Sequence, residues 1–158
     1  MPESKILVRD IMVKTVVSVL PETPLIKAAK MLALHNFDGM PVVDKENKLV
    51  GIITEYDFIS KSSMIHIPTF QIILDNLKIF KKDKFKFENE LKKISSFIVQ
   101  DVMNCEPITL SPDDTLEKAI ETFTNHHRVN PIPVVSDKLK VVGVISRFDI
   151  LKPFHDMI

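Results

Sequence analysis

The sequence predicts a mixed α/β (α+β) fold in which one unit of strand, helix, strand, strand and helix occurs twice. The chain matches itself at an offset of 91 residues and, after one inserted residue, at an offset of 92. Each copy surrounds one amphipathic helical stripe with short β-prone segments. With 158 residues, 45% of them hydrophobic, the chain can bury one sizeable core or two small ones.

The match begins where Val8-Arg9-Asp10-Ile11-Met12 aligns with Val99-Gln100-Asp101-Val102-Met103. Of the 47 positions aligned on either side of the insertion, 16 are identical, and they include the pairs Pro21/Pro112, Pro41/Pro133, Gly51/Gly143 and Asp57/Asp149. Internal duplication is the pattern to seek first, because it determines the domain organisation. We therefore divide the chain into a first copy (1–59), a connecting segment (60–98) and a second copy (99–158).

Each copy opens with a β-prone segment, Thr15–Val19 in the first and Pro107–Leu110 in the second. An amphipathic helix follows. We expect Thr23-Pro24 and Asp114-Thr115 to supply the N-cap and the first helical residue. In the second copy Glu117 lies three residues after Asp114, which is typical of a capping box.

Two more strands and a second helix complete the unit. The strands are predicted over residues 40–43, 49–53, 132–135 and 141–145. A second helix is expected to start near Thr54 in the first copy and near Ser146 in the second. A unit of about 50 residues buries too little apolar surface to be stable alone, so we expect the two copies to pack together.

The charge and composition exclude several classes of protein. The 21 basic and 21 acidic residues cancel, which gives no electrostatic case for nucleic acid or an anionic membrane as a partner. No apolar run approaches the roughly 20 residues that a spanning helix needs. The single cysteine, Cys105, cannot form an internal disulfide, which favours a reducing compartment. We expect a cytoplasmic protein.

Neither catalysis nor metal binding is indicated. The five histidines have no carboxylate or cysteine at a spacing typical of metal ligands. The chain also has no phosphate-binding glycine loop and no nucleophile motif. We predict no catalytic residues, no metal and no catalytic cofactor, and hence a protein that is not an enzyme.

Thr54-Glu55-Tyr56-Asp57 and Ser146-Arg147-Phe148-Asp149 follow the last strand of each copy. In one interpretation the hydroxyl is an N-cap, and the negative charge of the aspartate interacts favourably with the helix dipole. In the other, the hydroxyl donates to a phosphate oxygen and the aspartate accepts two hydrogen bonds from a ribose diol. The two interpretations are compatible.

The ordered set of Asp-x-Met, Pro-Val-Val, glycine and Thr/Ser-x-x-Asp, found twice, resembles the CBS domain. Two such domains in tandem are similar to a CBS pair, or Bateman module. The resemblance implies a stand-alone regulatory module that binds AMP, ADP, ATP or S-adenosylmethionine in the cleft between the repeats. It also implies a homodimer and an effector protein to receive the signal. The alternative is a structural or oligomerisation module with no nucleotide ligand.

The resemblance further implies an adenine pocket next to each Pro-Val-Val strand. Its positions here are Val17, Phe37, Asp38 and Gly39 in the first copy, and Ile108, Val129, Asn130 and Pro131 in the second. The Asp38-Gly39 and Asn130-Pro131 pairs are also ordinary turn dipeptides.

The two copies differ in charge. His127, Arg128 and Arg147 lie near the second motif, whereas Glu55 takes the place of Arg147 in the first. We therefore expect the Ser146/Asp149 side to favour a phosphorylated ligand, because charge-assisted hydrogen bonds to phosphate are strong. The Thr54/Asp57 side is expected to be weaker, empty or suited to an uncharged adenosine derivative.

Segment 60–98 belongs to neither copy and carries eight lysines and four acidic residues. Two helical stripes in it predict a helical insert. One interpretation is a linker hairpin packed on the module with its lysines in water. The other is a dimerisation or docking surface, since long connections often carry function.

Overall fold

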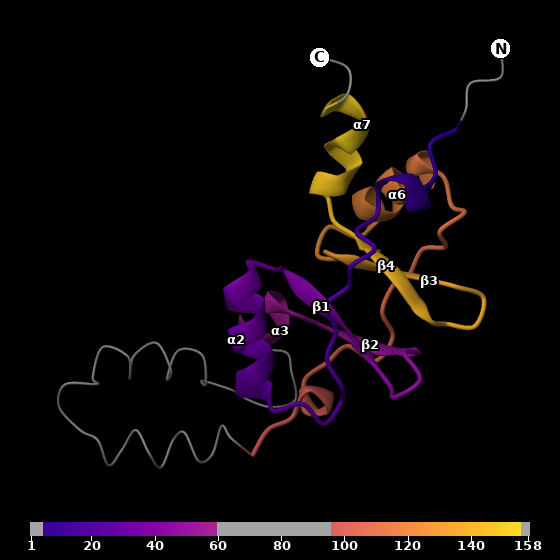
Figure 1. Ribbon diagram of the computed structural model, residues 1–158. Coiled ribbons are helices and arrows are strands. Elements are labelled where there is room, and N and C mark those ends of the chain that lie inside the picture. The colour runs from indigo at the N-terminus through magenta and orange to yellow at the C-terminus, as the bar shows by residue number, and fades with distance from the viewer. Residues whose placement is uncertain (1–4, 60–95, 156–158) are drawn as a thin grey trace.

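The computed structural model describes residues 5–59 and 96–155 (Figure 1). Each copy contains one antiparallel hairpin with helices beside it. The four strands predicted to follow the first helix of each copy are confirmed, the two in the first copy being one residue longer than expected. They are β1 (Gly39–Val43), β2 (Leu49–Thr54), β3 (Ile132–Val135) and β4 (Val141–Ile145). The predicted insert 60–98 lies, apart from its last three residues, outside the described part.

The helices occur where the repeat places them. In the first copy they are α1 (Val8–Ile11), α2 (Leu25–His35) and α3 (Glu55–Ile59). The second copy contains the 3-10 helix η1 (Val99–Asp101), α6 (Leu116–Asn125), the 3-10 helix η2 (Phe148–Leu151) and α7 (Lys152–His155). The mixed fold predicted from the sequence is confirmed.

The predicted helix starts are wrong by one residue in both copies. The N-caps are Pro24 and Thr115, and the Thr115 hydroxyl accepts a hydrogen bond from the Lys118 amide at 3.3 Å. Asp114 does not cap α6. Its carboxylate accepts from the Ser111 amide at 2.8 Å and pairs with the Lys118 ammonium at 2.7 Å. Asp114 thus stabilises the turn before the helix.

The β-prone segments that open each copy do not form full strands. Val19 makes a single parallel bridge to Val42 of β1, and Leu110 makes the equivalent bridge to Val134 of β3. The Val19 amide donates to the Pro41 carbonyl at 3.1 Å, and the Val43 amide donates to the Val19 carbonyl at 2.9 Å. Pro41 and Pro133 have no N–H to donate, so the parallel ladder cannot extend past them. Each copy is therefore limited to a single bridge.

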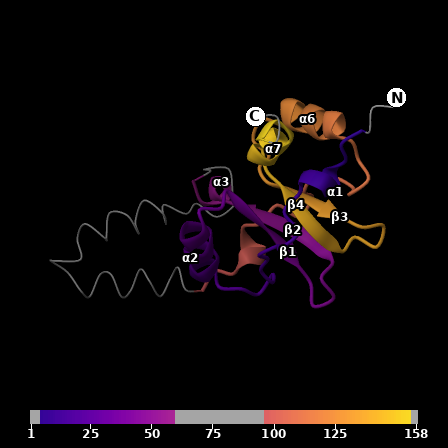
Figure 2. The ribbon, with the colours of Figure 1, turned by 45° about the horizontal axis from the view of Figure 1, so that its top comes forward.

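The short segment that opens each copy packs on the other copy. Val8 and Ile11 of α1 are buried with Leu110, Phe123 and the inner face of β3–β4, in what we call the second core. Figure 2 shows α1 beside α6, on the β3–β4 side of the molecule and away from α2. The Val8 amide donates to the Asp114 carbonyl at 2.8 Å, which fixes this position.

The segment that opens the second copy packs in turn on the first copy. Val99 and Val102, in and just after η1, are buried with Leu25 and Met40 in what we call the first core. The Leu25 amide donates to the Phe97 carbonyl at 2.9 Å, and the Val99 amide donates to the Thr23 carbonyl at the same distance. The repeats are therefore exchanged at their N-terminal segments, which ties the two halves into one body.

The tips of the two hairpins also meet. The Leu49 amide donates to the Leu139 carbonyl at 2.9 Å, and the Val141 amide donates to the Asn47 carbonyl at 3.1 Å. Asn47 and Leu139 occupy equivalent places in the repeat, so this pair of hydrogen bonds obeys a local twofold symmetry. Both residues have left-handed backbones, with φ of 63° and 60°. A small apolar cluster around Val43 and Val135 lies behind the contact.

The Asp-x-Met and glycine motifs contact each other. A Cβ placed on Gly143 of β4 would lie 2.5 Å from the Met12 sulfur, and one on Gly51 of β2 would lie 2.8 Å from the Met103 sulfur. The chain beyond each methionine runs along the strand, through bridges of Val13 to Val144 and of Asn104 to Ile52. The glycines thus permit close approach of the exchanged segments.

Candidate functional site

The Thr54/Asp57 motif forms a closed turn at the end of β2. Asp57 Oδ2 accepts from the Thr54 amide at 2.7 Å and from the Thr54 hydroxyl at 2.9 Å. The expected roles are therefore reversed, because the aspartate caps the turn and the hydroxyl donates a hydrogen bond to the aspartate. In this arrangement the Thr54 hydroxyl does not donate to a phosphate. Among the described residues, Asp57 Oδ1 has no recorded partner and can accept further hydrogen bonds.

A pocket of about 360 Å³ opens beside this turn, between the two copies. From the first copy it is lined by Ile52, Thr54, Tyr56 and Asp57. From the second copy it is lined by Asn104, Glu106, Pro107, Ile108, Arg128, Val129, Asn130 and Pro131. Seven of these residues were predicted as ligand-binding from the sequence: Thr54, Asp57, Ile108, Arg128, Val129, Asn130 and Pro131. The structure brings them together from both repeats rather than within one.

The exchange of N-terminal segments creates this combination. Asn104 follows η1 and bridges to Ile52 of β2, which carries the next residues of the second copy to the end of the first hairpin. Pro107 and Ile108 then line the pocket opposite Thr54. Sequence reasoning missed Ile52, Tyr56, Asn104, Glu106 and Pro107. All lie within two residues of a predicted position or within four of Met103. Their closeness to the repeat motifs is therefore the feature of the sequence that could have identified them.

Arg128 is the positively charged residue that lines the described pocket. Its Nη1 donates to the Tyr56 hydroxyl at 2.9 Å, and its guanidinium carbon lies 5.4 Å from the centre of the Tyr56 ring. These contacts hold a second-copy cation over a first-copy residue. The expectation that Arg128 belongs with Ser146/Asp149 is wrong, because the pocket it lines contains Thr54 and Asp57.

The acidic groups of the first copy are affected by burial. Burial raises the pKa of Asp57, although the hydrogen bonds from Thr54 lower it in part. Burial also raises the pKa of Glu55, and the Asp38 and Asp57 carboxylates raise it further. A low-dielectric environment disfavours the charged form of a carboxyl group. A hydrogen-bond donor or cation that approaches Asp57 would relieve this cost.

The second motif repeats the turn but differs around it. Asp149 Oδ2 accepts from the Ser146 amide at 2.7 Å and from the Ser146 hydroxyl at 2.8 Å. Its other oxygen, Oδ1, lies 2.6 Å from the ammonium of Lys152, and the residue is 6% exposed. Arg147 is directed away from Asp149, since its guanidinium donates to the His127 carbonyl and its amide donates to Asn130 Oδ1 at 3.1 Å.

The remaining predicted residues of the first copy lie elsewhere. Phe37 and Asp38 line a separate cavity of about 420 Å³ between α2 and α3, and the Phe37 ring stacks on His35 with centroids 5.0 Å apart. Val17 packs against the first core, and Gly39 is buried at the start of β1 against Pro131 and Thr54. The Asp38 carboxylate accepts from the Asn130 side chain.

The comparisons with known proteins agree with the repeat. The family model described as "CBS domain" matches residues 8–63 and 99–156. The chain belongs to the CBS domain family. A curated relative, the uncharacterized protein MJ1426 of Methanocaldococcus jannaschii, is 31% identical over 153 residues, which are 92% of this chain and 89% of the relative. Other curated relatives are much longer, and this CBS pair spans 22% and 23% of two of them.

Solved structures of CBS pairs have the same fold. CBSX2 of Arabidopsis thaliana superposes with a TM-score of 0.72 at 22% identity, over 98% of this chain and 97% of that one. The CBS domain pair of protein MJ0100, solved with 5′-methylthioadenosine and S-adenosyl-L-methionine, has a TM-score of 0.64 at 27% identity. That match covers 94% of this chain and 98% of the other.

Within residues 5–59 and 96–155, no group of three or more histidine, cysteine or acidic side chains is arranged to hold a metal ion. None of the helices in the same ranges is both long enough and apolar enough to cross a membrane.

Proposed function

We propose that this CBS pair is a regulatory module that binds one adenosine-containing ligand in the pocket between Thr54/Asp57 and Ile108/Arg128. The observation that carries the proposal is the composition of that pocket. It joins apolar walls, a guanidinium and a carboxylate whose Oδ1 has no partner among residues 5–59 and 96–155, each from a different part of the chain. Small-molecule sites typically combine apolar walls with a few placed polar groups.

Each part of the pocket suits one part of such a ligand. The walls formed by Ile52, Ile108 and Val129 suit a purine ring, which gains most from apolar contact. Asp57 Oδ1 suits the ribose hydroxyls, because an ionised carboxylate accepts hydrogen bonds from a diol. The volume of about 360 Å³ lies within the range of ligand pockets.

Arg128 suits the anionic end of the ligand. The described lining residues also include two acids, Asp57 and Glu106, so the pocket has no surplus of positive charge. A ligand with a single phosphate or carboxylate therefore fits the charges better than a triphosphate does. We infer a preference for AMP or S-adenosylmethionine over ATP. The MJ0100 pair, which was solved with two sulfur-containing adenosine compounds, supports this choice.

In our proposal the module has no catalytic group and signals through contacts with a protein partner. Phe148, Leu151 and Phe154 lie at intervals of three residues along η2 and α7 and are 80%, 56% and 60% exposed. Side chains of this kind often mark protein contacts. We propose that they contact a second copy of the chain or an effector protein. A cytoplasmic location, as the single cysteine favours, completes the proposal.

The test is calorimetric titration of the full chain with AMP, ADP, ATP, S-adenosylmethionine and 5′-methylthioadenosine. We expect binding of at least one compound, its loss in Asp57→Ala and a strong reduction in Arg128→Ala. Asp113→Ala is the matched control, because Asp113 is an exposed carboxylate paired with Arg9 on the surface. A ligand at 100 times its Kd stabilises a protein by about 2.7 kcal/mol, so thermal shift provides a second readout.

If no adenosine compound binds at millimolar concentration, the proposal fails and the structural or oligomerisation role remains. Binding that survives Asp57→Ala but not Asp149→Ala would place the ligand at the Ser146/Asp149 motif instead.

A further inference from the structure

The two Thr/Ser-x-x-Asp turns have the same internal geometry. In each, the aspartate Oδ2 accepts from the backbone amide and the hydroxyl of the first motif residue, at 2.7–2.9 Å. The oxygen that remains, Oδ1, is the atom that could bind a ligand. The two sites therefore differ only through what surrounds this atom.

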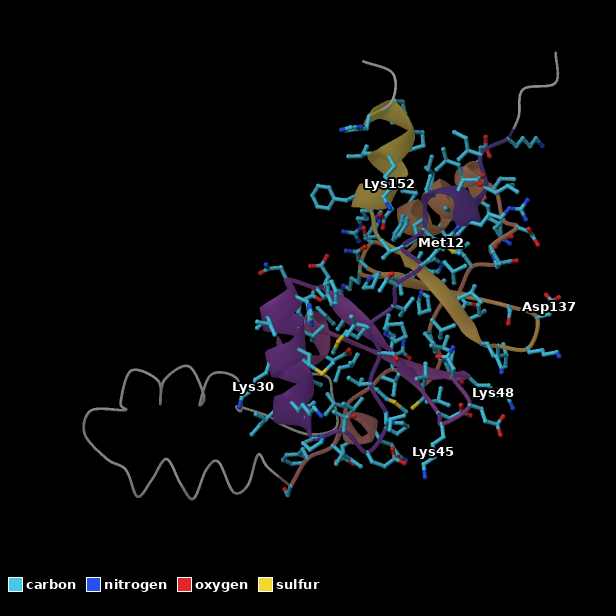
Figure 3. The ribbon with its side chains drawn as sticks, viewed as in Figure 1. Met12, Lys30, Lys45, Lys48, Asp137 and Lys152 are labelled. Carbon is cyan, nitrogen blue, oxygen red and sulfur yellow. The ribbon has the colours of Figure 1, made fainter. Side chains whose placement is uncertain are left out.

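Lys152 occupies that position in the second copy. Its ammonium lies 2.6 Å from Asp149 Oδ1 and donates to the Ile11 carbonyl at 2.7 Å. Ile11 is the last residue of α1. Its side chain is buried in the second core, which fixes the position of its carbonyl. In Figure 3, Lys152 lies at the start of α7, next to Met12 of the segment that follows α1.

The lysine is thus held from two sides. A ligand that used Asp149 Oδ1 would have to displace it, which would leave the Ile11 carbonyl at the end of α1 without this donor. Charge-assisted hydrogen bonds to a carboxylate with little exposure are among the stronger polar interactions in proteins.

The first copy has no equivalent contact within the described residues. At the offset of 92, Ser60 aligns with Lys152, so the sequence places no cation there. None of the recorded ion pairs in residues 5–59 and 96–155 involves Asp57. Among the described residues, the lysine–aspartate pair at this motif is therefore a feature of the second copy.

We propose that Lys152 is a built-in counter-ion that closes the Ser146/Asp149 site, so that the chain binds one adenosine ligand and not two. The inference rests on the proposed function, because it concerns the second of two equivalent ligand sites. It assigns to Lys152 a role that determines how many sites are available.

The test is calorimetry and equilibrium dialysis of the full chain with AMP and, in parallel, S-adenosylmethionine. We expect about one bound ligand per chain for the wild type and for Lys152→Arg, which keeps the cation. Lys152→Met is expected to bind about two, with a second affinity at least tenfold tighter than in the wild type. Asp149→Asn in the Lys152→Met background should remove the added site and leave the first.

Lys118→Met is the matched control. It breaks a lysine–aspartate pair on the same copy, with Asp114, without contact to Asp149, and should leave one site. Circular dichroism checks that each variant is folded, and Lys152→Ala replaces Lys152→Met if the latter is unfolded.

Two equivalent sites in the wild type, or a single site in folded Lys152→Met, would overturn the inference while leaving the proposed function intact. Binding to Lys152→Met but not to the wild type would support the closed second site and refute ligand binding at Asp57. Binding to neither protein would overturn both.

Discussion

The guanidinium of Arg128 hydrogen-bonds to the hydroxyl of Tyr56 across the boundary between the two repeats. The bond from Nη1 is 2.9 Å long, and the guanidinium carbon lies 5.4 Å from the ring centre. Both residues line the pocket that contains Asp57. This contact places the cation of one repeat at the ligand motif of the other, where its charge can be used.

The Tyr56 hydroxyl should therefore contribute to ligand affinity through Arg128. Tyr56→Phe keeps the ring and removes the hydrogen bond, so we expect AMP affinity to fall about three- to tenfold, as for one hydrogen bond of about 0.5–1.5 kcal/mol. Arg128→Ala should cost more, because it also removes the charge. Calorimetry measures both, with Arg147→Ala as control. If Arg147→Ala lowered AMP affinity as much as Arg128→Ala does, the assignment of Arg128 to the ligand pocket would be contradicted.

The raised pKa of Asp57 predicts a pH-dependent stability. Because burial holds this pKa above its unfolded value, the folded state binds the proton more tightly, and stability falls as pH rises through the interval between the two values. Asp57→Asn removes the charge and keeps an acceptor for the Thr54 amide. Without ligand, we expect its Tm to exceed that of the wild type at pH 7.

The Asp57→Asn advantage should shrink below the unfolded pKa, where both proteins are neutral at this position. Thermal melts between pH 3 and pH 7 provide the measurement. A variant that is less stable than the wild type at pH 7 would show that the ionised carboxylate is needed for folding.

The two strand glycines should respond differently to alanine. A Cβ on Gly51 would lie 2.8 Å from the Asn104 backbone carbonyl, whereas the nearest atom to one on Gly143 is the Met12 sulfur, which can rotate away. We expect Gly51→Ala to cost more than Gly143→Ala, with overpacking of this kind worth about 1–3 kcal/mol. Urea denaturation measures the difference, and Met12→Ala should rescue part of the Gly143→Ala loss. The reverse order of stability would refute the prediction.

The hairpin tips offer a stabilising substitution. Asn47 and Leu139 both have left-handed backbones, which asparagine tolerates and leucine does not. Leu139 is also 58% exposed, so its side chain contributes little burial. Leu139→Asn is expected to raise stability by about 1 kcal/mol. Asn47→Leu should lower it by more, because it also removes the hydrogen bond that the Asn47 side chain donates to the Val141 carbonyl at 3.1 Å. Equal melting temperatures for all three proteins would contradict this.

Local patterns predicted much of the fold. The strands at 132–135 and 141–145 were predicted at their observed bounds, because a short apolar run between turn signals needs only near neighbours to specify a strand. The helix starts were wrong by one residue, since Asp114 found partners in Ser111 and Lys118 instead of capping α6. The opening segments were predicted as strands, but Pro41 and Pro133 limit them to single bridges.

Many individual residues of the candidate site were predicted, but which of them lie together in one pocket was not. Thr54, Asp57, Ile108, Arg128 and Asn130 were all identified from the sequence, yet Arg128 was expected beside Asp149. The error follows from assigning the residues around each motif to a single repeat. In the structure, the segments that open the copies exchange places, and the pocket is assembled from both.

The sequence by itself determined the duplication, the order of elements, the CBS family and the residue types of the ligand motifs. These features can be recognised from the order and spacing of residues that lie close together in the chain. Only the tertiary structure decided that α1 packs on the second copy, that Arg128 joins Asp57 and that Lys152 pairs with Asp149. The two copies have nearly the same apolar pattern, so local preference cannot choose between packing within a repeat and packing across repeats. That choice depends on burial between segments about 91 residues apart.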